Sequence, residues 1–110
     1  MSNISFDEWK KLKIKVGKII TVENHPNADK LYILKVDIGE KQINLVAGLK
    51  KYYKIEELKN KLCIVITNLE PAIIRGVKSE GMLLAAVDKK NDKVVLITPE
   101  KEIAQGSNVE

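Results

Sequence analysis

Apolar and polar residues alternate along much of the chain, which is the pattern of strands that bury one face. In the stretch KIKVGKIITVE, lysines alternate with apolar residues of a single parity, namely Ile14, Val16, Ile20 and Val22. Gly17 and the apolar Ile19 interrupt this alternation, which predicts a bulge or a sharp bend. A long, bent first strand is what a small closed barrel requires, because one strand must serve both halves of the sheet.

Six further segments are predicted to be extended: LYILKVDIG, INLVAG, KLCIVITNL, AIIRG, GMLLAAV and KVVLIT. The segment KLCIVITNL carries a continuous apolar run, so we expect it to be buried on both faces and to stop at Pro71. The stretch HPNAD, from His25 to Asp29, is dense in turn formers and is expected to be a loop.

Two short helices are predicted. Ser5 and Glu8 fit a capping box, in which a hydroxyl and a carboxylate each satisfy a free backbone N–H group, so a helix should run from Phe6 to Leu12. The spacing of Phe6 and Trp9 puts both on one helix face, and we expect them to face the core, with Trp9 as an anchor. The segment GLKKYYKIEELKN predicts a second helical connection between the third and fourth strands.

The order of these elements predicts the fold class. Six or seven short strands with one mid-chain helix favour an all-β fold, either a small barrel or a sandwich. A helix between the third and fourth strands is the arrangement of the five-stranded Greek-key barrel called the OB-fold. At 110 residues the chain can bury a single core, so we expect one domain.

A cytoplasmic location without membrane association is expected. No apolar run approaches the roughly 20 residues that a membrane span requires, and the start MSNISFDEWKK lacks the apolar stretch of a signal peptide. Cys63 is the only cysteine and cannot form an intrachain disulfide, which agrees with a reducing compartment. Its apolar neighbours predict a buried, inert thiol.

The charge permits a polyanionic partner without requiring one. The formal net charge is +4, and the sequence pI is about 9.1. Lysines cluster at 10–18, 50–54 and 89–93, but each cluster has carboxylates nearby, and taken alone each is better explained as a solvated face than as a binding patch.

The sequence offers no catalytic constellation. It has one histidine and one cysteine, far apart, so no zinc site and no histidine-dependent nucleophile is predicted. The glycine-rich phosphate-binding motifs are absent as well. We therefore expect no catalytic residue, no metal and no cofactor. His25 is expected to order its own loop through hydrogen bonds.

The segment NLEPAIIRGVKSEGMLLAA contains the side chains with binding chemistry. Arg75, the only arginine, can hold a phosphate with two hydrogen bonds or stack on a base. Asn68 and Ser79 can donate to phosphate, 2′-hydroxyl or base edges, glycines allow close backbone approach, and Met82 offers an adaptable apolar surface. The alternatives are that Gly76 and Gly81 only shape turns, that Met82 belongs to the core and that Asn68 caps a turn.

Two long motifs, HPNADKL and NLEPAIIRGVKSEGM, resemble the tRNA-binding domain family, and the likeness runs from about Phe6 almost to the C-terminus. This family includes C-terminal domains of methionyl-tRNA synthetases, and the wording LYILKVDIGE and VAGLKKYY is most similar to the archaeal-type β subunit. The resemblance implies a non-catalytic OB-fold that binds tRNA largely by shape and backbone and assists a catalytic synthetase subunit.

The resemblance also implies particular residues and partners. It predicts a barrel over roughly residues 12–88 with a C-terminal extension over 89–110, and a homodimer whose interface includes the extension. Carried over by position, the RNA-facing residues are Asn68, Arg75, Ser79, Gly81 and Met82. Lys30, whose loop flanks the same mouth of the barrel, and Lys78 complete the predicted RNA-binding set.

This chain departs from the family where many members carry basic residues, because it has Glu70 and Ile73 there. Losing two cations should weaken phosphate attraction, which Lys78 partly offsets. Two other functions stay open at this point. One is a dimerisation or scaffolding domain of a synthetase complex, and the other is a chaperone-like relative of the same fold.

Overall fold

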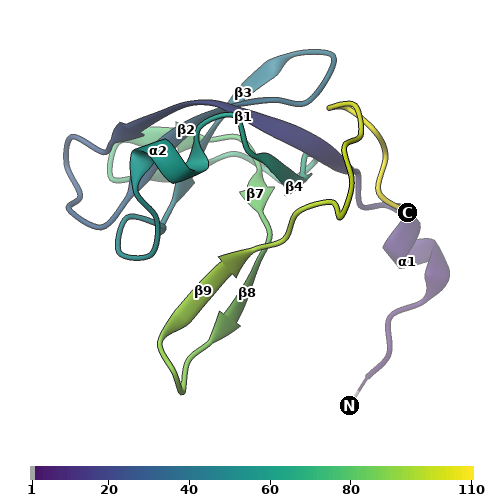
Figure 1. The fold of residues 1–110 in the computed structure, drawn as a ribbon. Helices are drawn as coiled ribbons and strands as arrows, with labels where there is room; N and C mark the ends of the chain where they lie inside the picture. Colours follow the sequence, from purple (N-terminus) through teal and green to yellow (C-terminus); the bar gives the residue numbers. More distant parts are fainter. Residues whose placement is uncertain (1) are drawn as a thin grey trace.

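The computed structural model describes residues 2–110, and its main feature is an antiparallel sheet of five strands wrapped into a nearly closed barrel (Figure 1). The strand order is β3-β2-β1-β4-β7, so β4 returns to lie beside β1, as in a Greek key. The bounds are β1 Ile14–Asn24, β2 Tyr32–Asp37, β3 Gln42–Ala47, β4 Leu62–Ile66 and β7 Met82–Leu83. The predicted five-stranded OB-type barrel is confirmed.

The long first strand joins the two halves of the sheet. Its first residues pair with β4 and its later residues pair with β2, and the register shifts between Ile19 and Thr21. This bulge confirms the predicted irregularity but changes the parity, so that Ile19 is fully buried and Ile20 is only partly buried. Gly17 lies where a Cβ atom would come 2.5 Å from Val36 Cγ1, which leaves room for no side chain.

One main core fills the barrel, and contacts between β3 and the segment before β7 close it. The largest fully buried side chains are Ile19, Leu34, Ile38, Leu45, Leu58, Val36, Val65 and Cys63. Leu58 comes from the predicted mid-chain helix, α2 Ile55–Leu58. Between β3 and the segment before β7, the Glu80 N–H group donates to Asn44 O over 2.8 Å. This bond joins the two edges of the sheet.

Strand β4 is buried on both faces, as predicted. Cys63 and Val65 belong to the main core, whereas Ile64 belongs to a second, smaller cluster outside the barrel with Ile14 and Val16. The strand ends at Ile66, before Pro71, so the prediction that the proline stops it is wrong. Beyond Ile66, the Thr67 N–H group still donates to Lys13 O, and the Asn68 side chain accepts the Lys13 N–H group at the end of the strand pair.

The N-terminal helix, α1 Phe6–Lys10, has the predicted capping box, with the Glu8 N–H group donating to Ser5 Oγ over 3.1 Å. It ends two residues earlier than expected. The prediction that Phe6 and Trp9 face the core is wrong, because their exposed fractions are 70% and 36%. The helix stands away from the barrel (Figure 1), so its apolar face has no core to pack against.

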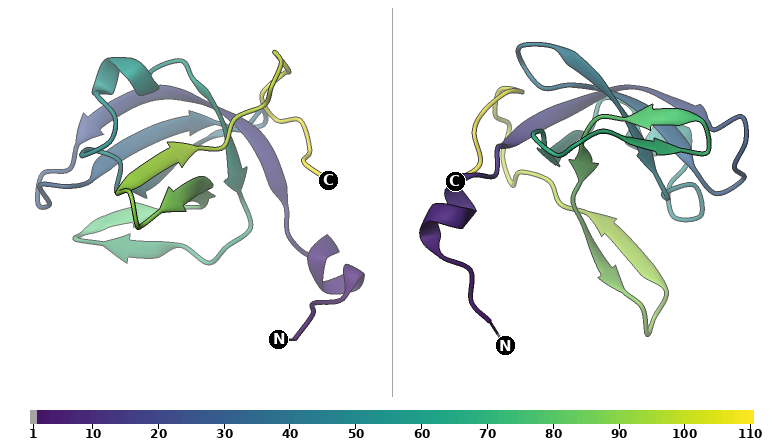
Figure 2. Two further views of the ribbon diagram at one scale, coloured as in Figure 1. Left: turned by 60° about the horizontal axis from the view of Figure 1, so that its bottom comes forward. Right: turned by 180° about the vertical axis from the view of Figure 1, so that it is seen from behind.

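Two hairpins follow β4 outside the five-stranded sheet. The first consists of β5 Ala72–Ile74 and β6 Val77–Ser79, and the second of β8 Ala85–Asp88 and β9 Lys93–Leu96. Residues 2–110 thus contain nine strands and not six or seven, because β6 was not predicted and because GMLLAAV is divided between β7, in the barrel sheet, and β8, in the second hairpin. The β8–β9 hairpin projects away from the barrel, whereas the β5–β6 hairpin lies beside the barrel at the level of its sheet (Figure 2, right).

The C-terminal tail runs back along the first half of β1. The Val16 N–H group donates to Ser107 O over 2.9 Å, and Val109 N–H donates to Ile14 O over 2.8 Å. The tail therefore extends the sheet along the start of β1, next to the end of α1 (Figure 1). No helix within residues 2–110 is long and apolar enough to cross a membrane.

Candidate RNA-binding interface

The two motifs that stand out in the sequence meet in space. His25 and Asn27 lie in the loop between β1 and β2, and they bind the backbone of the β5–β6 hairpin. The buried His25 ring accepts the Asn27 N–H group at Nδ1 over 3.0 Å, so its Nε2–H group donates to Ile74 O, also over 3.0 Å. The Asn27 side-chain amide donates to Arg75 O over 3.4 Å. His25 thus orders its own loop, as predicted, and also holds a hairpin about 50 residues away in sequence.

Arg75 and Gly76 form the two-residue turn of this hairpin. Their φ values are +53° and +87°, as a type I′ turn requires at both central positions. Such turns favour Asn, Asp or Gly, so an arginine in the first position is unusual and costs about 1 kcal/mol in backbone strain. The contacts from the HPNAD loop go to backbone atoms, and the guanidinium is left exposed.

Ser79 and Gly81 are used inside the protein. Ser79 is 6% exposed, and its hydroxyl accepts the Val46 N–H group over 3.1 Å while donating to Gly81 O over 3.4 Å. A Cβ atom on Gly81 would come 2.8 Å from Ile66 O. Both residues therefore attach the hairpin to the barrel, and their contact with RNA stays a prediction.

Asn68 is also engaged. Its Oδ1 atom accepts the Lys13 N–H group over 2.8 Å, and its Nδ2 group donates to Lys11 O over 2.7 Å. It fixes the link between α1 and β1 against the end of β4. The predicted contact of this side chain with RNA is untested, and contact would have to replace or share these bonds.

The remaining predicted residues have exposed side chains: Lys30, Arg75, Lys78 and Met82. None of the three cations takes part in an ion pair among residues 2–110. Lys78 pairs with the exposed Ile73 across the hairpin, whereas Ala72 and Ser79 pair on its opposite face. The hairpin thus presents one face with a cation to solvent, and the other face borders a groove.

A groove of about 470 Å³ lies between the β5–β6 and β8–β9 hairpins, and we call it the hairpin groove. Its walls are almost wholly apolar and come from β3, both hairpins and the segment before β5. Ser79, Gly81 and Met82 line it, so the structure brings three of the predicted residues to one place. Its apolar walls, including Leu69 and Val87, were missed, because alternation alone does not show which hairpin faces meet.

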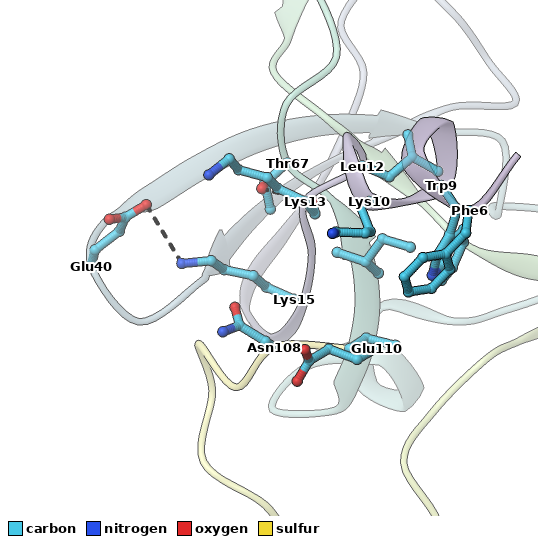
Figure 3. A pocket seen from close by; sticks show the side chains of 12 residues that line it. Phe6, Trp9, Lys10, Leu12, Lys13, Lys15, Glu40, Thr67, Asn108 and Glu110 are labelled. Atoms are coloured by element: carbon cyan, nitrogen blue, oxygen red, sulfur yellow. Dashed lines mark hydrogen bonds and ion pairs between the residues drawn. The ribbon is translucent and has the colours of Figure 1, made fainter.

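A larger hollow of about 630 Å³ lies on the other side of the molecule, between α1 and the C-terminal tail. Phe6 and Trp9 stand at one end, and an ion pair between Lys15 Nζ and Glu40 Oε1, 3.8 Å apart, lies at the other (Figure 3). This hollow is lined by no residue that the sequence predicts to bind RNA.

The single thiol of the chain lies in the core. Burial raises the pKa of the Cys63 thiol to about 12, so it is an inert core thiol, as predicted. Within residues 2–110, no three His, Cys, Asp or Glu side chains lie close enough together to hold a metal ion. The groups present suit binding through cations, amides and apolar contact.

The sequence matches the family profile described as a putative tRNA-binding domain over residues 14–108. The methionine–tRNA ligase of Pyrococcus horikoshii is 57% identical over 109 residues, which cover 99% of this chain but 15% of that enzyme. The corresponding ligase of Nanoarchaeum equitans is 56% identical over 106 residues, covering 96% of this chain and 13% of the enzyme. The chain thus spans about one seventh of the length of these relatives.

Solved structures give the same grouping. A methionyl-tRNA-synthetase-related protein from Pyrococcus horikoshii superimposes with a TM-score of 0.92 at 34% identity, with all of both chains covered. The chaperone CsaA from Bacillus anthracis gives a TM-score of 0.88 at 26% identity, covering 99% of this chain and 100% of that one. With its barrel, its two joined motifs and these matches, the chain belongs to the tRNA-binding domain family, as the resemblance predicted.

Proposed function

We propose that this chain is a non-catalytic tRNA-binding module that assists a methionyl-tRNA synthetase in the cytoplasm. The observation that supports this most is the Arg75 turn. An arginine occupies a strained backbone position, two loop residues hold that backbone, and the guanidinium remains exposed. Strain of this kind is retained where a side chain has a function.

An exposed arginine at a fixed hairpin tip suits a phosphate of a folded RNA. The fork-shaped guanidinium can donate two hydrogen bonds to one phosphate, and its fixed backbone reduces the entropy lost on binding. Lys30 lies in the loop that holds the hairpin, and Lys78 lies on the outer face of β6. Contacts with phosphates raise affinity without reading sequence, which is what an accessory module contributes.

The partner follows from the relatives. Two of them are methionine–tRNA ligases many times longer than this chain. A catalytic synthetase part is therefore the proposed partner, and the module would raise its hold on tRNA, whether the two parts lie in one chain or in two.

We also propose that the module is a homodimer. Phe6, Trp9 and Leu12 expose apolar surface in the hollow between α1 and the tail, and a second copy could bury it. Multi-angle light scattering should give twice the mass of the 12.4 kDa chain. The mass of a single chain would contradict the proposal.

The experiment that tests the function compares binding of fluorescent tRNA and of a DNA duplex of similar length across a salt series. Arg75→Asn is the informative variant, because asparagine tolerates positive φ and keeps the turn while removing the cation. We expect wild type to prefer tRNA, and Arg75→Asn to weaken binding and reduce the salt slope by about 1. Arg75→Lys should leave the salt slope unchanged, because the charge is kept, and should lower the affinity, because lysine cannot donate two hydrogen bonds to one phosphate in this way.

Equal binding of tRNA and duplex, with no effect of Arg75→Asn, would contradict the proposal. The lysine clusters would then act only as non-specific charge, and a scaffolding role would explain the fold better. The similarity to CsaA favours a second candidate, chaperone activity, because the hairpin groove exposes apolar side chains. Suppressed aggregation of an unfolded client by the wild-type chain would support it.

A further inference from the structure

The hairpin groove has no role in the proposed binding of tRNA through Arg75, and we infer that it receives one unpaired base of the bound RNA, with Glu70 accepting hydrogen bonds from that base. This inference rests on the proposed function and specifies how the same face meets its ligand. It assigns a role to Glu70, the residue that otherwise only weakens the attraction for phosphate.

The shape of the groove suits a flat apolar ring. Its volume of about 470 Å³ lies within the range of small-ligand sites. Ala72 and Ile74 of β5 line one side, and Ala85 and Val87 of β8 line the other. A planar base between two such walls would bury both of its faces.

The exposed apolar surface of the groove also indicates a ligand. Leu69, Met82 and Val87 line it, and their exposed fractions are 37%, 53% and 60%. Neighbouring apolar side chains left open to water at the edge of a groove typically mark a binding surface. Met82 can adjust its conformation to a ring of either size, because a thioether chain is flexible and polarizable.

The charge of Glu70 favours a base, which has hydrogen-bond donors at its edge, over a purely apolar ligand. Glu70 is the only charged residue among those that line the groove, and a carboxylate only accepts hydrogen bonds. Guanine offers adjacent N–H and NH₂ donors on its Watson–Crick edge, which match the two carboxylate oxygens, whereas uracil offers one donor between two carbonyl acceptors. The groove should therefore prefer guanine to uracil.

The adjacent cation suits the phosphate of the same nucleotide. Ile74 lines the groove, and Arg75 follows it directly at the hairpin tip. A nucleotide whose base enters the groove therefore carries its phosphate toward the end of the hairpin where the guanidinium is exposed. Such an arrangement occurs only in single-stranded parts of an RNA, because a paired base cannot be inserted.

The test uses fluorescent hexaribonucleotides in anisotropy titrations: a hexamer of uridines, the same hexamer with one central guanosine, and one with inosine, which lacks the amino group. The wild-type chain should bind the guanosine hexamer roughly 10-fold more tightly than the uridine hexamer, as for one well-formed bidentate pair. Inosine should fall between the two.

Two variants address the groove, and one is a matched control. Glu70→Gln should raise the affinity for the uridine hexamer, because a negative charge is lost, and should remove the preference for guanosine. Ala72→Leu should fill the groove and weaken the guanosine hexamer alone. Ala86→Leu makes the same change on the face of β8 opposite Ala85 and Val87, and should have no effect.

The outcomes separate the groove from the proposed function. If Glu70→Gln raises the affinity for all hexamers equally, the carboxylate is only repulsive and the inference is overturned, while tRNA binding sensitive to Arg75 would keep the proposed function. If no hexamer and no tRNA binds, both fall. If Ala72→Leu blocks an apolar unfolded peptide and leaves RNA unaffected, the groove is a protein site and the inference is overturned.

Discussion

The two hairpins outside the barrel use the same backbone conformation in opposite ways. Each has a non-glycine residue with a φ of +53° in its turn, Arg75 in one and Asp92 in the other. The Asp92 carboxylate binds Lys51 Nζ and Tyr52 OH, so that side chain attaches its hairpin to the barrel. In the β5–β6 hairpin the contacts from His25 and Asn27 go to the backbone, and the side chain of Arg75 is left exposed.

The difference shows that two similarly strained turns leave their side chains in opposite situations. Both turns carry strain, and both are held by residues from the barrel. The β8–β9 hairpin is held by the side chain of its strained residue, Asp92. The β5–β6 hairpin is held by the side chains of His25 and Asn27, which bind its backbone. An exposed arginine whose backbone is fixed in this way is available for a ligand.

The largest expected effect comes from removing the ring that supports the β5–β6 hairpin. His25→Ala should lower the free energy of unfolding by about 3 kcal/mol, because it removes two hydrogen bonds and a buried side chain. Urea denaturation followed by far-ultraviolet circular dichroism measures this, and tRNA affinity should fall in the same variant. Asn27→Ala, which removes one long bond at the surface, is the milder comparison. Equal losses in the two variants would contradict the role given to the ring.

The second effect concerns the point where the chain passes from one hairpin to the other. Gly81→Ala should cost about 2 kcal/mol of stability, because its Cβ atom would come 2.8 Å from the backbone oxygen of Ile66 and push the start of β7 away from β4. Gly48→Ala is a suitable control, since its Cβ would meet nothing closer than Leu31 Cδ2 at 3.8 Å. Unchanged urea midpoints in both variants would show that the edge adapts freely.

The same substitution in the two turns should act in opposite directions. Arg75→Asn should raise stability by up to about 1 kcal/mol, because asparagine tolerates positive φ and no contact of the side chain is lost. Asp92→Asn keeps a residue that tolerates positive φ but loses the charge, so it should lower the urea midpoint. Binding of tRNA should distinguish the same two variants, because only Arg75→Asn should reduce the slope of affinity against salt concentration. A loss of stability in Arg75→Asn would mean that its guanidinium is part of the structure.

The smallest expected effect is a dependence on pH in the β8–β9 hairpin. Hydrogen bonds from Lys51 and then Tyr52 hold the pKa of Asp92 below its ordinary 3.8. A carboxyl whose pKa is lower in the folded state adds stability above pH 3.8, and that contribution disappears as the pH falls through the folded value. The NMR chemical shifts of the Tyr52 ring should change as the pH falls through this range in the wild type, because the hydrogen bond from Tyr52 OH to Asp92 weakens, and should not change in Asp92→Asn. Identical titrations would contradict the link.

The fold was largely predictable from local patterns. Alternation placed the strands, Ser5 and Glu8 marked the first helix, and Gly17 with Ile19 indicated the bulge in β1. Each of these patterns involves only a few neighbouring residues, so it predicts its element without knowledge of the rest of the molecule. The candidate site was predictable only in part. The sequence singled out Arg75 and Lys78, but it showed neither the internal partners of Ser79 and Asn68 nor the apolar walls of the hairpin groove.

What the sequence by itself determined is the set of elements and the side chains that carry binding chemistry, Arg75 above all. The tertiary structure decided which of them are exposed. Closing the barrel brings the HPNAD loop to the hairpin, uses Ser79 and Asn68 in internal hydrogen bonds and leaves Trp9 partly exposed. These outcomes depend on contacts between residues far apart in the chain, and the spacing of neighbouring residues contains no information about them.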